Sequence, residues 1–114
     1  MSDYKSRIKQ ALIDKLKNEH FLWSYDTSSI TDIPRDMLIE LVMLHLDLDD
    51  INLLFQIYSR NQIKQAWLHN LVVQGERYET LNRFFAWYYF DIKQPKRYVK
   101  IMATRQFNKR LGLK

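Results

Sequence analysis

The stretch PRDMLIELVMLHL, residues 34–46, decides the fold, because its side chains are apolar on nearly every face of a helix. Glu40 and His45 are its main polar interruptions. A helix without a polar face has to be covered by neighbours on several sides. Pro34 suits the start of a helix, where a missing N–H costs little, and Asp36 lies near the positive end of the helix dipole. We therefore expect this helix to form the nucleus of a helical core.

Residues 4–19, which precede it, show the pattern of a surface helix. Ile8, Leu12 and Leu16 lie on one stripe, and the opposite face is rich in lysine. The segment FLWSYDTSSITDI, residues 21–33, then breaks the helical period with turn-forming residues. We expect this segment to be a loop that is held to the core by its apolar side chains, which are Phe21, Leu22, Trp23 and Ile30.

Helical patterns also follow residues 34–46. Asp47 and Asp49 carry oxygens that can cap a third helix, whose apolar positions are Ile51, Leu54, Phe55 and Tyr58. A fourth helix is expected to end at Gly75, a fifth covers about residues 77–90 and a sixth about residues 95–109. Sustained alternation of apolar and polar residues, the pattern of strands, does not occur. The sequence predicts an all-α fold, a compact bundle of about six helices in a single domain, residues 1–114.

Length and composition agree with one folded helical domain. The 114 residues include 46% hydrophobic residues, no cysteine and only two glycines and two prolines, so the chain can bury a core without disulfides. The N-terminal segment is charged throughout and lacks the apolar run of a signal peptide. No apolar run approaches the roughly 18–20 residues that span a bilayer. We expect a cytoplasmic protein without membrane contact.

The net charge of +5 is distributed unevenly, because every charged residue after Asp91 is a lysine or an arginine. A helix over residues 95–109 places Arg97, Lys100, Thr104 and Asn108 on one face and Tyr98, Val99 and Met102 on its inner side. Such a positive field suits a nucleic acid or an acidic partner, and a merely solvated face is the alternative. The candidate nucleic-acid contacts in this region are Lys93, Lys96, Arg97, Lys100, Arg105, Lys109 and Arg110.

The stretch FFAWYYF, residues 84–90, has six aromatic residues in seven positions. Successive residues step about 100° around a helix, so the rings cannot all share one face. Phe84 and Tyr88 lie together, whereas Trp87 and Phe90 point elsewhere. We expect the stretch to belong to the core, with Phe84 and Tyr88 buried. Rings that the bundle leaves uncovered would contact a partner, and Trp87 and Phe90 are the candidates.

The helices on either side of YSRN, residues 58–61, are comparable to a helix-turn-helix pair in the middle of the chain, whose second helix would read bases in a major groove. Ser59 stands where such motifs often have glycine, and Phe55 stands where they need a small residue. Lys64 and Gln65 are the candidate nucleic-acid contacts on the second helix, and contact with water is the alternative for both.

Residues for catalysis or metal binding are not brought together by any motif. The three histidines, His20, His45 and His69, are far apart in the sequence, and cysteine is absent, so metal-ligand spacing is missing. The sequence has no phosphate-binding glycine loop and no nucleophile elbow. We expect no enzymatic activity, no metal and no cofactor. His45 is expected to be a hydrogen-bonded core residue.

Three segments, residues 21–43, 47–67 and 76–95, share a pattern of short motifs with a known family. The matching residues are Trp23, Asp26, Ile39, Glu40, Asp50, Leu54, Tyr58, Ile63, Lys64, Leu81, Asn82, Phe84 and the FDI triplet at residues 90–92. Over residues 21–92 the chain thus resembles a family of small bacterial helical domains that occur beside nucleotidyltransferase toxins. Ser59 replaces the glycine of that pattern, and Ser24 and Tyr25 lengthen its first motif.

The resemblance implies a non-enzymatic, antitoxin-like protein of a bacterial toxin–antitoxin pair. It implies a nucleotidyltransferase-type toxin as partner and operator DNA as a second ligand, and it leaves the oligomeric state open. It brings no catalytic residues to this sequence. The residues themselves leave an alternative, a stand-alone nucleic-acid-binding transcriptional regulator.

Overall fold

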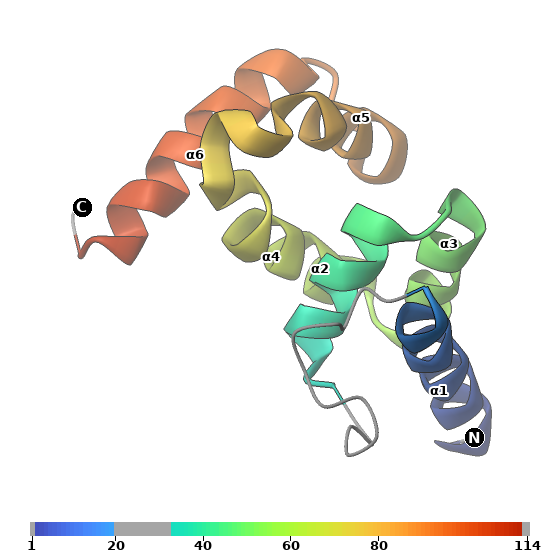
Figure 1. Ribbon diagram of the computed structural model, residues 1–114. Helices are drawn as coiled ribbons and strands as arrows, with labels where there is room; N and C mark the ends of the chain where they lie inside the picture. Colours follow the sequence, from blue (N-terminus) through green and yellow to red (C-terminus); the bar gives the residue numbers. More distant parts are fainter. Residues whose placement is uncertain (1, 20–32, 113–114) are drawn as a thin grey trace. The chain divides into compact units, whose positions relative to one another are not determined.

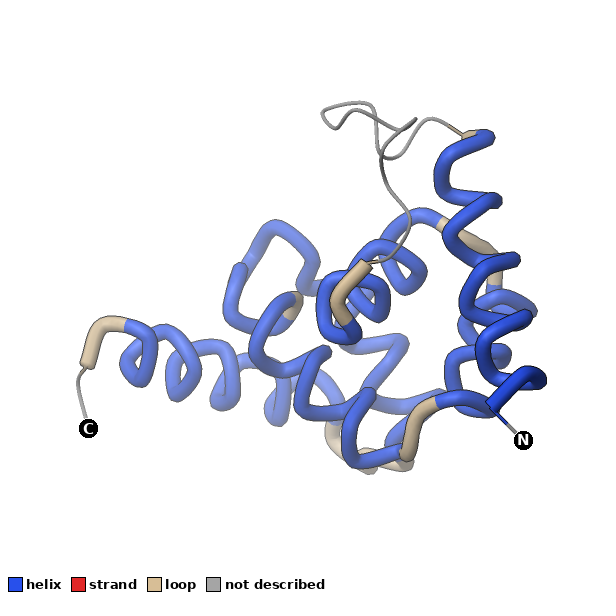
Figure 2. Tube along the Cα trace, turned by 90° about the horizontal axis from the view of Figure 1, so that it is seen from below, coloured by secondary structure: helices blue, strands red, loops and turns tan. Residues whose placement is uncertain are grey.

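The computed structural model describes residues 2–19 and 33–112, and these residues form helices and no strand (Figures 1 and 2). The helices are α1 (Ser2–Asn18), α2 (Arg35–His45), α3 (Leu48–Ile57), α4 (Arg60–Asn70), the 3₁₀ helix η1 (Val72–Tyr78), α5 (Glu79–Phe90) and α6 (Pro95–Arg110). The prediction of an all-α fold with about six helices is confirmed. The predicted loop at residues 21–33 lies, up to residue 32, outside the described residues.

The chain divides into two compact units, Met1–Ile63 and Lys64–Lys114, which we call the N-terminal and the C-terminal unit. The boundary falls inside α4. Our interpretation of the whole chain as one domain therefore stays a prediction. The comparison of α3 and α4 with a helix-turn-helix also stays a prediction, because this pair belongs partly to each unit.

The core of the N-terminal unit is formed by α1, α2 and α3, which pack against one another. Leu38, Ile39, Val42 and Met43 of α2 are buried, but its other residues are half-buried or exposed, so the prediction that this helix is covered on all sides was wrong. His45, in the last turn of α2, is exposed, so its assignment to the core was wrong. Partial burial of its ring lowers the pKa of His45.

Side-chain capping interactions are present at the N-termini of α3 and α4. Asp47 and Asp50 form a capping box at the start of α3, in which the Asp47 N–H donates to Asp50 Oδ2 over 3.2 Å. The second acid of this cap is thus Asp50 rather than the predicted Asp49. Lys15 of α1 donates to the same Asp50 oxygen over 2.7 Å, which ties α1 to α3. At the start of α4, Ser59 Oγ accepts the Gln62 N–H over 3.1 Å.

The C-terminal unit is built around the indole of Trp67, which is fully buried. Asn82 of α5, also buried, accepts a hydrogen bond from Trp67 Nε1 over 3.0 Å and donates one to the Leu71 carbonyl over 3.3 Å. The Trp67 ring packs on the Phe90 ring with centroids 4.8 Å apart, and it stacks on Tyr98 of α6 at 6.4 Å. These contacts join residues of α4, α5 and α6 into one core.

Chain reversals in this unit use residues with positive φ. The fourth helix ends at Asn70, not at Gly75 as predicted, and the chain continues into η1. Gly75 lies within η1 as a kink with φ 65° and ψ −129°, a conformation that favours glycine. Asp91 closes α5 in the left-handed region with φ 54°, and α6 then packs beside η1 and α5 (Figure 1).

None of the helices in the described ranges has the length and apolarity to cross a membrane.

Candidate interaction surfaces

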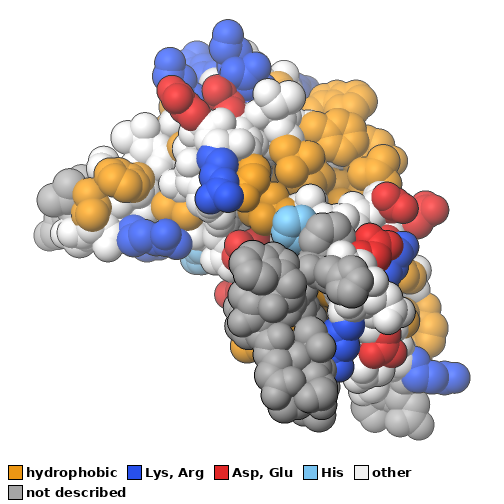
Figure 3. All heavy atoms as spheres, in the orientation of Figure 1, with side chains coloured by type: hydrophobic (Ala, Val, Ile, Leu, Met, Phe, Trp, Pro, Cys, Tyr) orange, Lys and Arg blue, Asp and Glu red, His pale blue; other side chains and the backbone are white. Residues whose placement is uncertain are grey.

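The aromatic residues of α5 divide between a buried and an exposed face. Phe85 and Phe90 are buried with Asn82 and Ala86, and they face the Trp67 core. On the other side, 59% of Trp87 and 48% of Tyr88 are exposed. Figure 3 shows hydrophobic side chains gathered over α5. This helix therefore contributes both to the core and to a surface.

Two predictions about this stretch were wrong. Tyr88 was expected in the core, but it lies on the exposed face, and Phe84 is only half-buried. Phe90 was a candidate for partner contact, but only 4% of it is exposed, because its ring packs on Trp67. Trp87 is accessible to a partner, as its assignment requires, and its role in binding stays a prediction.

The exposed and half-buried apolar residues of α5 form one continuous surface, which we call the α5 aromatic surface. It consists of Leu81, Phe84, Trp87 and Tyr88. The Phe84 and Tyr88 rings stack at 5.2 Å with an interplanar angle of 13°, and the Phe84 and Trp87 centroids lie 6.2 Å apart. At its N-terminal end the surface continues into a cleft of about 420 Å³, which is lined by Glu76, Arg77, Tyr78, Thr80, Leu81 and Phe84. The Arg77 guanidinium lies 5.1 Å from the centre of the Tyr78 ring.

The second surface is the cation-rich face of α6. The predicted cations of this region, Lys93, Lys96, Arg97, Lys100, Arg105, Lys109 and Arg110, are all exposed. Thr104 is exposed and Asn108 half-buried, while Val99 is buried and Tyr98 and Met102 are half-buried. The predicted outer face is thus confirmed for Arg97, Lys100 and Thr104 but not for Asn108, which is partly covered. Sequence reasoning missed Gln106, which is buried on the inner side without any apolar signal to mark it.

Lys64 and Gln65, the candidate base contacts of α4, differ in their surroundings. Lys64 is half-buried, and its Nζ lies 5.6 Å from the centre of the Tyr98 ring in a cation–π contact. Gln65 is exposed. The Lys64 side chain therefore helps to hold α6 against α4, and its assignment to nucleic acid stays a prediction.

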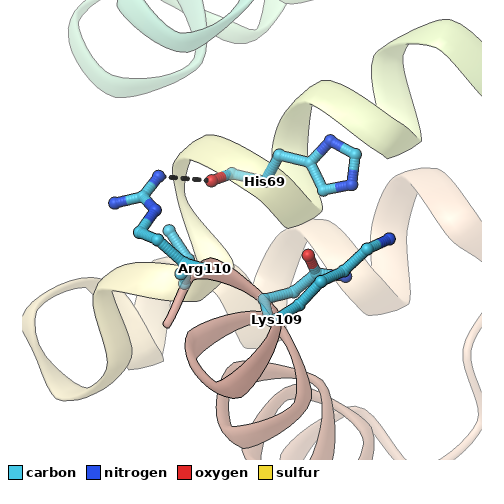
Figure 4. A pocket seen from close by; sticks show the side chains of 5 residues that line it. His69, Lys109 and Arg110 are labelled. Atoms are coloured by element: carbon cyan, nitrogen blue, oxygen red, sulfur yellow. Dashed lines mark hydrogen bonds between the residues drawn. The ribbon is translucent and has the colours of Figure 1, made fainter. Parts of the chain in front are cut away.

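Arg110 also has a structural contact in addition to its predicted role. Its Nη2 donates a hydrogen bond to the His69 carbonyl over 3.1 Å, and this contact stabilises the C-terminal end of α4. Figure 4 shows the guanidinium directed at that carbonyl, whereas the His69 ring and the Lys109 side chain point the other way. They line a shallow hollow of about 230 Å³ together with Val73, Gln106 and Arg110.

The charge of the C-terminal unit is strongly positive. It contains eleven lysine and arginine residues against three acids, a net charge of +8, whereas the N-terminal unit has seven against ten, a net charge of −3. Among the acids, the pKa of Glu79 is lowered, first by a hydrogen bond from Arg83 and then by the charges of Arg83, Lys100 and Lys96. Lys100 also lines a hollow of about 290 Å³ together with Glu76 and Glu79.

Metal-binding side chains are not grouped in the described ranges, where no set of three or more histidine and acidic residues is placed to hold an ion. Comparison of the chain with protein-family models, with curated proteins and with solved structures found no match. The functional assignment therefore depends on the exposed surfaces and on the resemblance described above.

Proposed function

We propose that this chain is a non-enzymatic, antitoxin-like protein, which binds a nucleotidyltransferase-type toxin through the α5 aromatic surface. The observation that carries the proposal is the exposure of Trp87 and Tyr88, at 59% and 48%, beside the half-buried Phe84. Contiguous apolar surface of this kind marks interaction sites on folded proteins, and Trp and Tyr are the residues most enriched among strong contacts at interfaces.

Several residues that match the family pattern serve the fold and are not available for binding. Ile39, Leu54 and Ile63 are buried, Asp50 caps α3, and Asn82 bonds Trp67 inside the C-terminal core. These matching residues maintain the helices and their packing. Specific recognition of a toxin then falls to exposed residues of the same elements, of which Trp87 is the most accessible aromatic residue in the described ranges.

Co-expression with a nucleotidyltransferase-type protein encoded beside this chain tests the proposal. We expect the wild-type chain to copurify with that protein and to restore the growth of cells that express it. Trp87→Ala is expected to lose at least about 30-fold in affinity, because large exposed aromatics are frequent hot spots. Phe107→Ala is the matched control, since Phe107 is an aromatic residue of α6 with 52% exposure. Absence of both copurification and growth rescue for the wild type would contradict the proposal.

The cation-rich face of α6 favours DNA as a ligand. An antitoxin would bind DNA in addition to the toxin, and a stand-alone regulator would bind DNA without a toxin. Arg97, Lys100 and Thr104 are exposed on one face, and the sequence contains no acid after Asp91. Binding to the chain's own upstream DNA can be followed by mobility shift and by fluorescence anisotropy. Silent Lys64→Ala and Gln65→Ala substitutions would show that α4 does not read bases.

The salt dependence of DNA binding should report on Arg97 and Lys100 directly. Neutralising each residue is expected to reduce the slope of log K against log salt by about 0.9 if its side chain contacts a phosphate. The melting temperature should stay nearly constant, because exposed charges contribute little to stability. A slope that stays the same after both substitutions would show that this face is only solvated.

A further inference from the structure

Gln106 of α6 is a buried polar side chain without a partner in the described ranges. Only 9% of this residue is exposed, and its amide forms no hydrogen bond to a described residue. Buried polar side chains nearly always have a partner, which is a protein group, an ordered water or a ligand. Gln106 lines the hollow of about 230 Å³ beside His69, which we call the His69 hollow. A partner of the Gln106 amide therefore has its place in this hollow.

Two further polar side chains of the His69 hollow have no contact with a described residue that would occupy them. The His69 ring and the Lys109 ammonium form no hydrogen bond and no ion pair within the described ranges. Figure 4 shows both side chains directed to the same side, away from the Arg110 guanidinium. The hollow thus offers one positive charge and two polar groups, which come from α4 and α6.

The surroundings of the His69 hollow favour a negative ligand. Carbonyls at the C-terminal end of a helix carry partial negative charge and repel anions. The Arg110 Nη2 donates to the His69 carbonyl over 3.1 Å, so a guanidinium offsets this charge at the end of α4. None of the residues that line the hollow is an acid, and the C-terminal unit has a net charge of +8.

Two other hollows beside α6 lack this combination. The hollow of about 290 Å³ contains Lys100, but Glu76 and Glu79 line it as well. A hollow of about 390 Å³ near the start of α6 contains Lys96, Arg97 and Lys100, but none of its lining residues is a buried polar group. Among these three hollows, the His69 hollow alone joins a cation to a buried, unpaired amide without an acid.

We propose that the His69 hollow binds one phosphate group, with Lys109 as its counter-charge and with the Gln106 amide and the His69 ring as hydrogen-bond donors. Phosphate presents several strong acceptor oxygens, and lysine is a common phosphate ligand. The hollow of about 230 Å³ is smaller than the roughly 300–1,000 Å³ of sites that enclose drug-sized ligands, so it holds the phosphate and leaves the rest of the ligand outside.

The phosphate belongs either to a small phosphate ester or to the backbone of DNA, since both present the same acceptor oxygens. The site goes beyond the proposed function, because it needs no toxin. No residue of the α5 aromatic surface lines the His69 hollow. Loss of the phosphate site would therefore leave toxin binding through Trp87 unchanged.

Inorganic phosphate, titrated into the isotope-labelled full chain at constant ionic strength, is the first probe. We expect saturable changes in the NMR signals of the Gln106 amide and the His69 ring. Lys109→Gln should weaken phosphate binding at least about tenfold, the effect of losing one charge-assisted hydrogen bond. Arg105→Gln is the matched control and should have a much smaller effect, because it removes the same charge from an exposed position of α6 outside the hollow. Equal losses in both variants would overturn the proposal, because phosphate would then respond only to the net charge.

Gln106→Met tests the buried amide, because methionine fills a similar volume without hydrogen-bond donors. We expect weaker phosphate binding and a melting temperature no lower than that of the wild type, since no internal hydrogen bond is lost. Phosphate binding at wild-type strength in a folded Gln106→Met variant would show that the amide takes no part and would overturn the proposal.

The chain's own upstream DNA distinguishes the two sources of the phosphate. Changes at Gln106 and His69 with inorganic phosphate but not with DNA would assign the site to small phosphate esters. Changes with DNA that Lys109→Gln abolishes and Arg105→Gln retains would assign it to the DNA backbone. Unchanged signals of Gln106 and His69 with both ligands would overturn the proposal, and copurification with the toxin would still decide the proposed function separately.

Discussion

Replacing Phe85 with alanine is expected to lower the free energy of unfolding by about 3–5 kcal/mol, the range measured for truncation of buried phenylalanines. Phe85 is 1% exposed on the inner face of α5, and its ring lies 5.9 Å from that of Tyr89. Its removal leaves a cavity on the buried face of α5. Urea unfolding followed by far-UV circular dichroism measures the change.

Phe107→Ala is the control for this substitution, because it removes the same side chain from a position with 52% exposure. Its free energy of unfolding should stay within about 0.5 kcal/mol of the wild-type value. Tyr88→Ala should resemble the Phe107 variant more than the Phe85 variant, since Tyr88 is 48% exposed. A Phe85 variant as stable as the wild type would show that the two faces of α5 have been assigned the wrong way round.

Replacing Asn82 with alanine is expected to cost about 2–6 kcal/mol, because two buried groups lose their partner and each such group costs about 1–3 kcal/mol. These groups are Trp67 Nε1, which donates to Asn82 over 3.0 Å, and the Leu71 carbonyl, which accepts from it over 3.3 Å. Asn52→Ala, at an exposed position of α3, is the matched control and should be nearly neutral.

A double-mutant cycle with Trp67→Phe separates the two hydrogen bonds. Without the indole N–H, loss of Asn82 leaves only the Leu71 carbonyl unsatisfied, so Asn82→Ala should cost less in that background. Identical costs in both backgrounds would mean that the hydrogen bond between Trp67 and Asn82 contributes nothing to stability. The cycle thus measures whether a polar contact organises the C-terminal core.

Local periodicity was sufficient to predict the helices and several of their ends. The apolar pattern of residues 34–46 predicted the helix α2 but overestimated its burial, and Asp47 marked the start of α3. Gly75 was recognised as a break but was assigned to the wrong element, because a glycine with positive φ serves equally at a helix end or at a kink inside η1. Such a signal locates a turn without specifying which helix it ends.

The orientation of α5 was not predictable from its own residues. In a helix that is aromatic on several sides, Phe84 and Tyr88 form as good a stripe as Phe85 and Tyr89, so periodicity does not choose between them. The choice is made by Asn82, which has to meet Trp67, a residue 15 positions earlier in the chain. This hydrogen bond turns Phe85 and Phe90 inward and leaves Trp87 and Tyr88 outside. The sequence therefore predicted the aromatic helix but not its exposed face.

We propose that α5 uses one face for folding and the opposite face for binding a toxin. Calorimetric titration of the toxin with Trp87→Ala tests it most directly, provided that the melting temperature of the variant matches that of the wild type. We predict a loss of affinity of at least about 30-fold, the effect of removing one interface hot spot, with Phe107→Ala unchanged. A Trp87→Ala variant that binds the toxin as tightly as the wild-type chain would contradict the claim.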